Sequence, residues 1–137
     1  MIKVVINTNV LISAVLNPNG VPAKIMESVY SGEFEPIVTD EILEEYHSVL
    51  NYKKFDFSHK NVTQTLNFFK QFLLPLPPAS LSVKCADSDD TKFLAAAVTG
   101  EAEFLITGNR KHFPKKVPDL VIITPREMFN FILSIAK

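Results

Sequence analysis

The stretch Lys3-Val4-Val5-Ile6-Asn7-Thr8-Asn9-Val10-Leu11 decides the fold of this chain. It opens with a short β-branched run that has no polar residue inside it, which is typical of a strand buried on both faces of a parallel sheet. Three small polar residues follow at the carboxyl end, where open α/β sheets have their ligand crevice. We therefore interpret Asn7, Thr8 and Asn9 as a candidate site, although the same residues also suit a plain turn from strand to helix. Asn9 can cap a helix beginning at Val10, because its side-chain oxygen can accept amide hydrogens of a first turn.

The composition is that of a globular domain. At 137 residues, with 47% hydrophobic and 21% charged residues, the chain is long enough to bury a substantial core. Its net charge of −1 indicates that any nucleic-acid-binding surface must be local. The single cysteine, Cys85, excludes an intramolecular disulfide and a Cys-based zinc site. No apolar run reaches membrane length, and a strand starting at Ile2 leaves no room for a signal peptide, so we expect one cytoplasmic domain over residues 1–137.

Apolar and breaker residues alternate along the chain in the rhythm of strands and helices. We expect strands at 3–6, 34–38, 103–107 and 117–123, with a brief strand or extended link at 81–83. Helices are expected from residue 10, at 22–31, at 41–50, from about 59 until the prolines at 75–78, at 87–100 and from 125 onward. The phenylalanines of the fourth helix are expected in the core or in a dimer interface. This order predicts a three-layer α/β/α sandwich with a central parallel sheet and right-handed crossovers.

Polar residues at four places are predicted to meet at one edge of this sheet. They are Asn7 after the first strand, Glu45 on the third helix, the acidic run 87–90, and the turn 107–109 after the third strand. Oxygen ligands that converge in this way suit Mg²⁺ or Mn²⁺, which proteins hold with a few carboxylates and waters. An ion held there can activate a water and neutralise phosphate charge, which indicates metal-assisted cleavage of a phosphodiester.

These residues lie in motifs that resemble the PIN domain family. The motif order, spacing and strand-helix context agree over nearly the whole chain. The resembling stretches are VINTNVLISA at 5–14, EILEEYHSVL at 41–50, DSDDTKFLAAA at 87–97 and LITGNRKHFP at 105–114. Within the family, the chain is most similar to the VapC-like toxin components of prokaryotic toxin-antitoxin systems.

The resemblance implies a PIN-like fold and a Mg²⁺- or Mn²⁺-dependent endoribonuclease that cleaves single-stranded RNA by metal-activated water. It also implies a cognate antitoxin as partner and a homodimer. Carried over position by position, it gives the metal ligands as Asn7, Glu45, Asp90 and Asn109. The catalytic carboxylates are then Glu45, Asp87 and Asp90, and the supporting residues are Thr8, Asn9 and Thr107.

Position 7 departs from the family, which usually has an aspartate there. Asparagine keeps one carbonyl oxygen but lacks the negative charge, and its NH2 group can only donate hydrogen bonds. Because affinity for a dication depends partly on the charge of its ligands, we expect weakened metal binding and low or absent nuclease activity. Asn109 is a smaller departure, since related sequences have either aspartate or asparagine there.

The remaining polar residues divide into a basic patch and single side chains. Arg110, Lys111, Lys115 and Lys116 follow the pocket turn and form a patch that either contacts an RNA backbone or is plain solvated surface. Glu44 points about 100° away from Glu45 around the helix, so we expect it in solvent. We expect Asp89 to be exposed or capping, His47, His59 and His112 to be structural or at the surface, and Cys85 to be a buried thiol.

Two other functions fit parts of this pattern. A non-catalytic PIN-fold module that binds RNA or a partner protein would explain the amides at Asn7 and Asn109. A phosphatase of the haloacid dehalogenase kind shares the spacing of Asn7 and Asn9, but its chemistry needs a carboxylate nucleophile where this chain has Asn7. No nucleotide-binding glycine motif is present, so no organic cofactor is expected.

Overall fold

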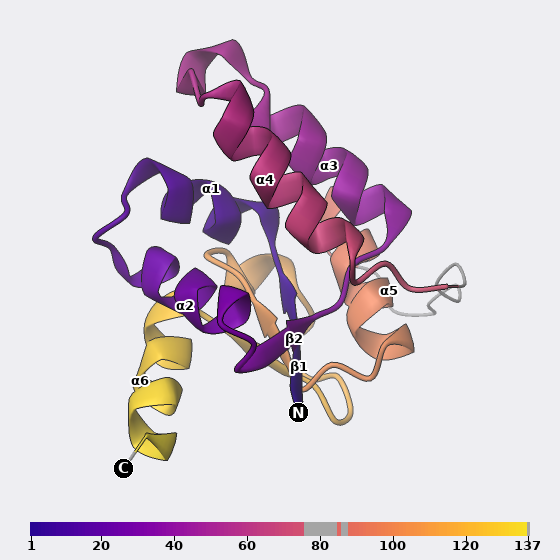
Figure 1. Ribbon diagram of the computed structural model, residues 1–137. Coiled ribbons are helices and arrows are strands. Elements are labelled where there is room, and N and C mark those ends of the chain that lie inside the picture. Colours follow the sequence, from indigo (N-terminus) through magenta and orange to yellow (C-terminus); the bar gives the residue numbers. More distant parts are fainter. Residues whose placement is uncertain (76–84, 86–87, 137) are drawn as a thin grey trace.

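The computed structural model describes residues 1–75, 85 and 88–136 (Figure 1). The prediction for residues 81–83 lies outside these residues. The strands are β1 (Ile2–Ile6), β2 (Phe34–Pro36), β3 (Phe104–Ile106) and β4 (Val121–Ile123). The helices are α1 (Thr8–Leu16), α2 (Val21–Tyr30), α3 (Asp40–Leu50), α4 (His59–Lys70), α5 (Thr91–Thr99) and α6 (Pro125–Ile135), with short 3-10 helices η1 (Lys53–Phe55), η2 (Ser88–Asp90) and η3 (Arg110–His112).

The strands form one parallel sheet in the order β2-β1-β3-β4. Val4 of β1 pairs with Pro36 and Phe104 on its two sides, and Ile106 of β3 pairs with Ile123 of β4. The carboxyl ends of β1, β3 and β4 therefore lie side by side. This register is what brings the polar residues that follow the strands to one edge, as parallel strands connected by crossover helices require.

Helices cover both faces of the sheet, which confirms the predicted α/β/α sandwich. In Figure 1, α1, α2 and α6 lie on one side of the strands, and α3, α4 and α5 lie on the other. Helix α2 packs against both α1 and α6, α3 packs against α4, and α5 packs directly on β1 and β3. Among the described residues, no helix has the length and apolarity needed to cross a membrane.

The core follows the predicted apolar pattern. Val4, Val5 and Ile6 are at most 1% exposed, as expected for a strand covered on both faces. The phenylalanines of α4 are expected in the core or in a dimer interface, and Phe69 belongs to the core. It is completely buried and packs against the Tyr46 ring with 5.0 Å between ring centroids. Phe69 also lies near the Tyr30 ring, with 6.5 Å between ring centroids, so the aromatic residues of α4 join α3 to α2.

Several predicted boundaries are wrong: the helix expected at 87–100 begins only at Thr91, after η2, and the strand expected at 34–38 ends at Pro36. Two further boundaries differ because a backbone contact intervenes. Helix α4 ends at Lys70, before the prolines, because Leu74 donates a backbone hydrogen bond to the Val38 carbonyl at 2.9 Å and draws the chain into an extended path. The last strand begins at Val121 and not at Val117. Val117 instead bridges to Leu120 across a tight turn, in which Asp119 has a φ of 63°.

Candidate active site

Asn7 stands where β1 passes into α1. Its backbone N–H completes the β1–β3 ladder by donating to the Ile106 carbonyl at 2.9 Å, and its side chain is 5% exposed. Its Oδ1 accepts from the Asn9 N–H at 3.3 Å, so Asn7 is the residue that caps α1 and the helix begins at Thr8. The prediction that Asn9 caps a helix from Val10 is therefore wrong. The strand ends at Ile6 as predicted, but the helix follows at once, so the first polar side chain, that of Asn7, is the one that reaches the free amides.

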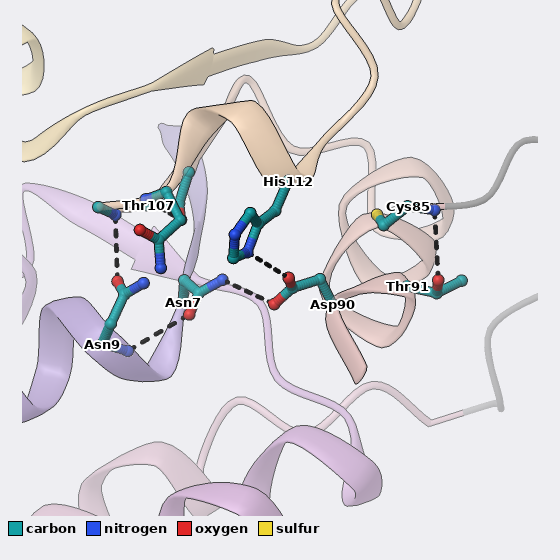
Figure 2. A network of polar contacts seen from close by, with 9 residues as sticks. Asn7, Asn9, Cys85, Asp90, Thr91, Thr107 and His112 are labelled. Carbon is teal, nitrogen blue, oxygen red and sulfur yellow. Dashed lines mark hydrogen bonds and ion pairs between the residues drawn. The ribbon is translucent and has the colours of Figure 1, made fainter. Parts of the chain in front are cut away.

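Asn9 connects the turn after β1 to the turn after β3. Its Oδ1 accepts a hydrogen bond from the Gly108 N–H at 3.1 Å (Figure 2). In the same turn, the Thr107 hydroxyl accepts from the Asn109 N–H at 3.0 Å. Thr107 is fully buried, whereas Asn109 is exposed. Asn9 thus holds the two turns against each other, whereas Thr107 stabilises the second turn from within.

Helix α3 brings Glu45 to the same edge. The Thr39 hydroxyl caps this helix by accepting from the Ile42 N–H at 3.2 Å. Two turns later, Glu45 accepts a short hydrogen bond from the Thr8 hydroxyl, while the neighbouring Glu44 is exposed on another face. The adjacent residue, Tyr46, sets the orientation of α3. It is 1% exposed, and its hydroxyl donates a hydrogen bond to the carbonyl of Ile6.

Burial also sets the ionisation of Tyr46. Removal from water raises the pKa of the Tyr46 phenol well above its usual value, and the negative charge of Glu45 acts in the same direction. The hydroxyl therefore remains a donor at any physiological pH. The bond to Ile6 is made to the residue that precedes Asn7, so it couples the position of α3 to the end of β1.

Lys92 is the cation that faces Glu45. Its ammonium nitrogen lies 2.6 Å from Glu45 Oε1, and the side chains are 19% and 25% exposed, respectively. Lys92 belongs to the first turn of α5, two residues after Asp90. Residues two apart at the start of a helix point in different directions. Asp90 and Lys92 therefore reach different partners, although both lie at the start of α5.

Asp90 connects the ends of β1 and β3. Its Oδ1 accepts from Asn7 Nδ2 at 3.5 Å, and its Oδ2 lies 3.2 Å from Nδ1 of His112 in η3. Figure 2 shows Asn7 and His112 both directed at this carboxylate. The Asp90 side chain is 16% exposed and that of His112 is 48% exposed. Solvent therefore reaches this pair mainly from the histidine side.

Other predicted residues lie around this cluster or beyond the described part of the chain. Asp87 lies outside the described residues. Cys85 is buried, and its backbone N–H donates to the Thr91 hydroxyl at 3.4 Å (Figure 2). The four basic residues after β3 are exposed, and three of them, Arg110, Lys111 and Lys115, line one hollow.

The oxygen donors at this edge fit a hard divalent ion in kind, though their charge is reduced. Glu45 and Asp90 supply carboxylate oxygens, and Asn7 supplies a carbonyl oxygen, which are the ligand types that Mg²⁺ and Mn²⁺ prefer. Each of these groups already has a hydrogen-bonding or ionic partner from the protein. Among residues 1–75, 85 and 88–136, no three acidic, histidine or cysteine side chains lie close enough together to hold a metal ion by themselves.

Sequence reasoning assigned no role in the cluster to Lys92 or to His112. Both residues lie inside the motifs quoted above, at 87–97 and 105–114, and each is a basic side chain close to acidic or amide ligands. Their position inside these motifs is the feature of the sequence that could have identified them as part of the cluster. Which carboxylate each one meets depends on the relative placement of α3, α5 and η3, which a linear pattern does not contain.

Comparison with known proteins agrees with this architecture. A sequence profile of the PIN domain matches residues 3–111, which is most of the chain. The chain belongs to the PIN domain family. It is 34% identical over 112 residues to the uncharacterized protein MJ1680 of Methanocaldococcus jannaschii, covering 80% of this chain and 72% of that protein.

A solved structure shares the fold of this PIN domain. It is the crystal structure of VapBC2 from Rickettsia felis, bound to a DNA fragment from their promoter. The superposition has a TM-score of 0.58 with 17% sequence identity, and it covers 90% of this chain and 98% of the other. At this identity the likeness concerns the fold, and it places the polar edge of the sheet within a PIN-type framework.

Lys92→Gln is expected to strengthen metal binding by this PIN domain. The tethered ammonium neutralises Glu45, so its removal leaves a carboxylate with more negative charge available to a dication; in the Asn7→Asp background we expect an affinity gain of about tenfold for Mn²⁺. Calorimetric titration of Mn²⁺ measures this change. Lys24→Gln, which removes an exposed lysine of α2, is the matched control. A weaker affinity of the Lys92 variant would show instead that the ion pair holds Glu45 in position for the metal.

Proposed function

We propose that this chain is a divalent-metal-dependent endoribonuclease of the toxin-antitoxin type whose activity is weakened by Asn7. One observation carries the proposal. Polar groups from four segments meet at the carboxyl edge of the sheet in a PIN domain: the side chains of Asn7, Glu45 and Asp90, and the backbone of the turn after β3. Carboxylates gathered at such an edge suit the binding of a cation that acts on a phosphodiester.

Glu45, Asp90, Asn7 and Asn109 would hold the ion, with Asp87 as a further acid. The chemistry that bound Mg²⁺ or Mn²⁺ supplies is activation of a water for attack on phosphorus and neutralisation of phosphate charge. The protein's part is to orient the ligands. Thr8 does so for Glu45 through its hydroxyl.

The amide at position 7 explains why activity is expected to be low. Asn7 Oδ1 is engaged as the cap of α1, and its NH2 group donates toward Asp90. A donor in contact with a metal-ligating carboxylate competes with the ion for that carboxylate. The protein's own hydrogen bonds thereby compensate part of the acidic charge that a dication would otherwise neutralise.

The expected partners follow from the proposed function. The similar fold in the Rickettsia felis VapBC2 structure supports an antitoxin protein as a partner of this chain. Single-stranded RNA is the proposed substrate, and a homodimer, a single domain over residues 1–137 and a cytoplasmic location belong to the same proposal. Gel filtration coupled to light scattering tests the homodimer.

A non-catalytic module that binds RNA or a protein is the second candidate. The observation that favours it is the pairing of the cluster within the chain: Lys92 with Glu45, and Asn7 and His112 with Asp90. A cluster stabilised by its own cation and donors keeps its shape without catalysing a reaction. RNA binding that is unchanged by Mn²⁺ and by Asn7→Asp, without cleavage, is the result that this candidate predicts.

Cleavage of a labelled single-stranded RNA distinguishes the two candidates. The chain, its Asn7→Asp variant and an Asn7→Asp/Asp90→Asn double variant are compared in Mn²⁺ and in EDTA. The nuclease proposal expects cleavage by the single variant only in Mn²⁺, and loss of that cleavage in the double variant. Absence of cleavage by Asn7→Asp under every condition contradicts the proposal.

A further inference from the structure

A hollow opens beside the acidic cluster, between η3 and the edge strand β4. We call it the basic pocket, and it is lined by Arg110, Lys111, Phe113, Pro114, Lys115 and Ile122. Its volume is about 480 Å³, within the range of small-molecule sites. The lining combines three cationic side chains with a floor of apolar ones, of which Phe113 is 6% exposed. The pocket therefore offers both charge and an apolar surface to one occupant.

The charge of this pocket is a local excess. The chain as a whole has a net charge of −1, yet the side chains that line the pocket include three cations and no acid. Among the described residues, only Arg110 of these cations has an acidic partner at ion-pair distance, Glu127 just outside the lining. An exposed hollow with this charge attracts anions, and phosphate is the anion that Arg and Lys bind most readily in nucleic acids. Pro114 and Ile122, which are partly exposed, supply the kind of surface on which a base or sugar can rest.

Arg110 is held in place from α6. Its Nη1 lies 2.6 Å from Glu127 Oε1, and Glu127 itself belongs to the capping box that begins α6 at Thr124. The Arg110 hydrogen bond lowers the pKa of Glu127, with further hydrogen bonds from Thr124 acting the same way. Only one nitrogen of the guanidinium makes this contact, and a guanidinium has five N–H donors. The pair therefore orients Arg110 and leaves donors for a ligand.

The basic pocket and the acidic cluster share one short segment. His112 lies between Lys111 and Phe113, and its ring is 3.2 Å from Asp90. Figure 2 shows this ring projecting from η3 toward Asp90. A polymer with a phosphate at Asp90 would therefore have its next unit within reach of the basic pocket, which favours a chain of nucleotides over an isolated anion.

We propose that the basic pocket binds a nucleotide of single-stranded RNA that neighbours the one at the acidic cluster. Arg110, Lys111 and Lys115 contact its phosphates, and the apolar floor contacts its base or sugar. The proposal rests on the proposed function, since it assigns the adjoining part of the same substrate. A single strand is favoured because its unstacked bases can enter a hollow of this size, whereas bases within a duplex remain stacked.

The test measures RNA binding without cleavage. Fluorescence anisotropy of a labelled, mixed-sequence single-stranded RNA is recorded in EDTA with the chain, with Lys111→Gln/Lys115→Gln, and with Lys53→Gln/Lys54→Gln as a charge-matched control in η1. The pocket variant is expected to bind about tenfold more weakly at about 50 mM salt, and the salt slope is expected to fall by about 0.7 for each phosphate that the variant no longer neutralises. The control is expected to bind as the unchanged chain does.

Equal affinities and salt slopes for the pocket variant and the control overturn the proposal. Equal or tighter binding of a duplex DNA of the same sequence overturns the assignment to single-stranded RNA. The two proposals fail in distinguishable ways. If Asn7→Asp does not cleave RNA but the pocket variant loses RNA binding, the nuclease proposal fails and the pocket proposal stands. If Asn7→Asp cleaves RNA and the pocket variant binds RNA as the unchanged chain does, the pocket proposal fails and the nuclease proposal stands.

Discussion

Asn7→Asp is expected to increase the affinity of this PIN domain for Mn²⁺ by on the order of 10- to 100-fold, because one ligand gains a full negative charge. The side chain is 5% exposed, so solvent screens the added charge only weakly. Carboxylate and amide have nearly the same size, and a carboxylate can still accept the capping hydrogen bond from the Asn9 N–H. The change is thus confined to charge and to the loss of the NH2 donor. Calorimetric titration with Mn²⁺ measures the affinity of the variant and of the unchanged chain.

The same variant is expected to respond oppositely in stability with and without metal. In EDTA, a carboxylate at position 7 faces Asp90 in place of the donor that now lies 3.5 Å from Oδ1, so the thermal midpoint should fall. Saturating Mn²⁺ should raise it again, since a ligand that binds only the folded state stabilises that state. Asn19→Asp, which adds the same charge at an exposed loop residue, is the control and should show neither effect. An unchanged Mn²⁺ affinity in Asn7→Asp contradicts the metal assignment.

Tyr46→Ala is expected to lower the free energy of unfolding by about 3–5 kcal/mol, the cost typical of truncating a buried aromatic residue. Tyr46 is 1% exposed and packs against the fully buried Phe69. Its hydroxyl also donates to the Ile6 carbonyl, so the variant removes the contact that couples α3 to the end of β1. Urea unfolding with an unchanged m-value measures the loss.

Tyr46→Phe separates the hydrogen bond from the packing. The ring remains, and the expected loss is about 1–3 kcal/mol, because a buried carbonyl loses a donor. Tyr52→Phe, at a ring that is 48% exposed, is the matched control, and its effect should stay within about 0.5 kcal/mol. A loss for Tyr46→Phe no larger than that of the control would show that Ile6 does not depend on this bond.

The arrangement of strands and helices was predictable because it depends on short-range patterns. Val4 to Ile6 are apolar on both faces of a strand, and this pattern alone indicates a buried parallel strand. The placement of Asn7, Glu45 and Asp90 at one edge follows from the same rule, since each follows a strand or faces the edge from a helix. The errors concern ends of elements, where a single backbone bond such as that from Leu74 to Val38 decides.

The pairing of side chains at the site was not predictable in this way. Asn7 was identified as the departure from the family pattern, but its two bonds, as cap of α1 and as donor to Asp90, are visible only in the folded chain. Lys92 and His112 belong to motifs that were noticed for their acids and amides. Their partners, Glu45 and Asp90 respectively, are distant in sequence and lie on other elements.

The sequence by itself thus determined the fold, the family resemblance and the missing charge at position 7, because hydrophobic periodicity and residue identity are properties of the linear chain. The tertiary structure alone decided which groups neutralise the acidic cluster and where the basic pocket opens beside it. Such contacts depend on the relative positions of α3, α5, η3 and β4, and electrostatic interactions between them depend on distance and burial, which arise only when those elements pack together.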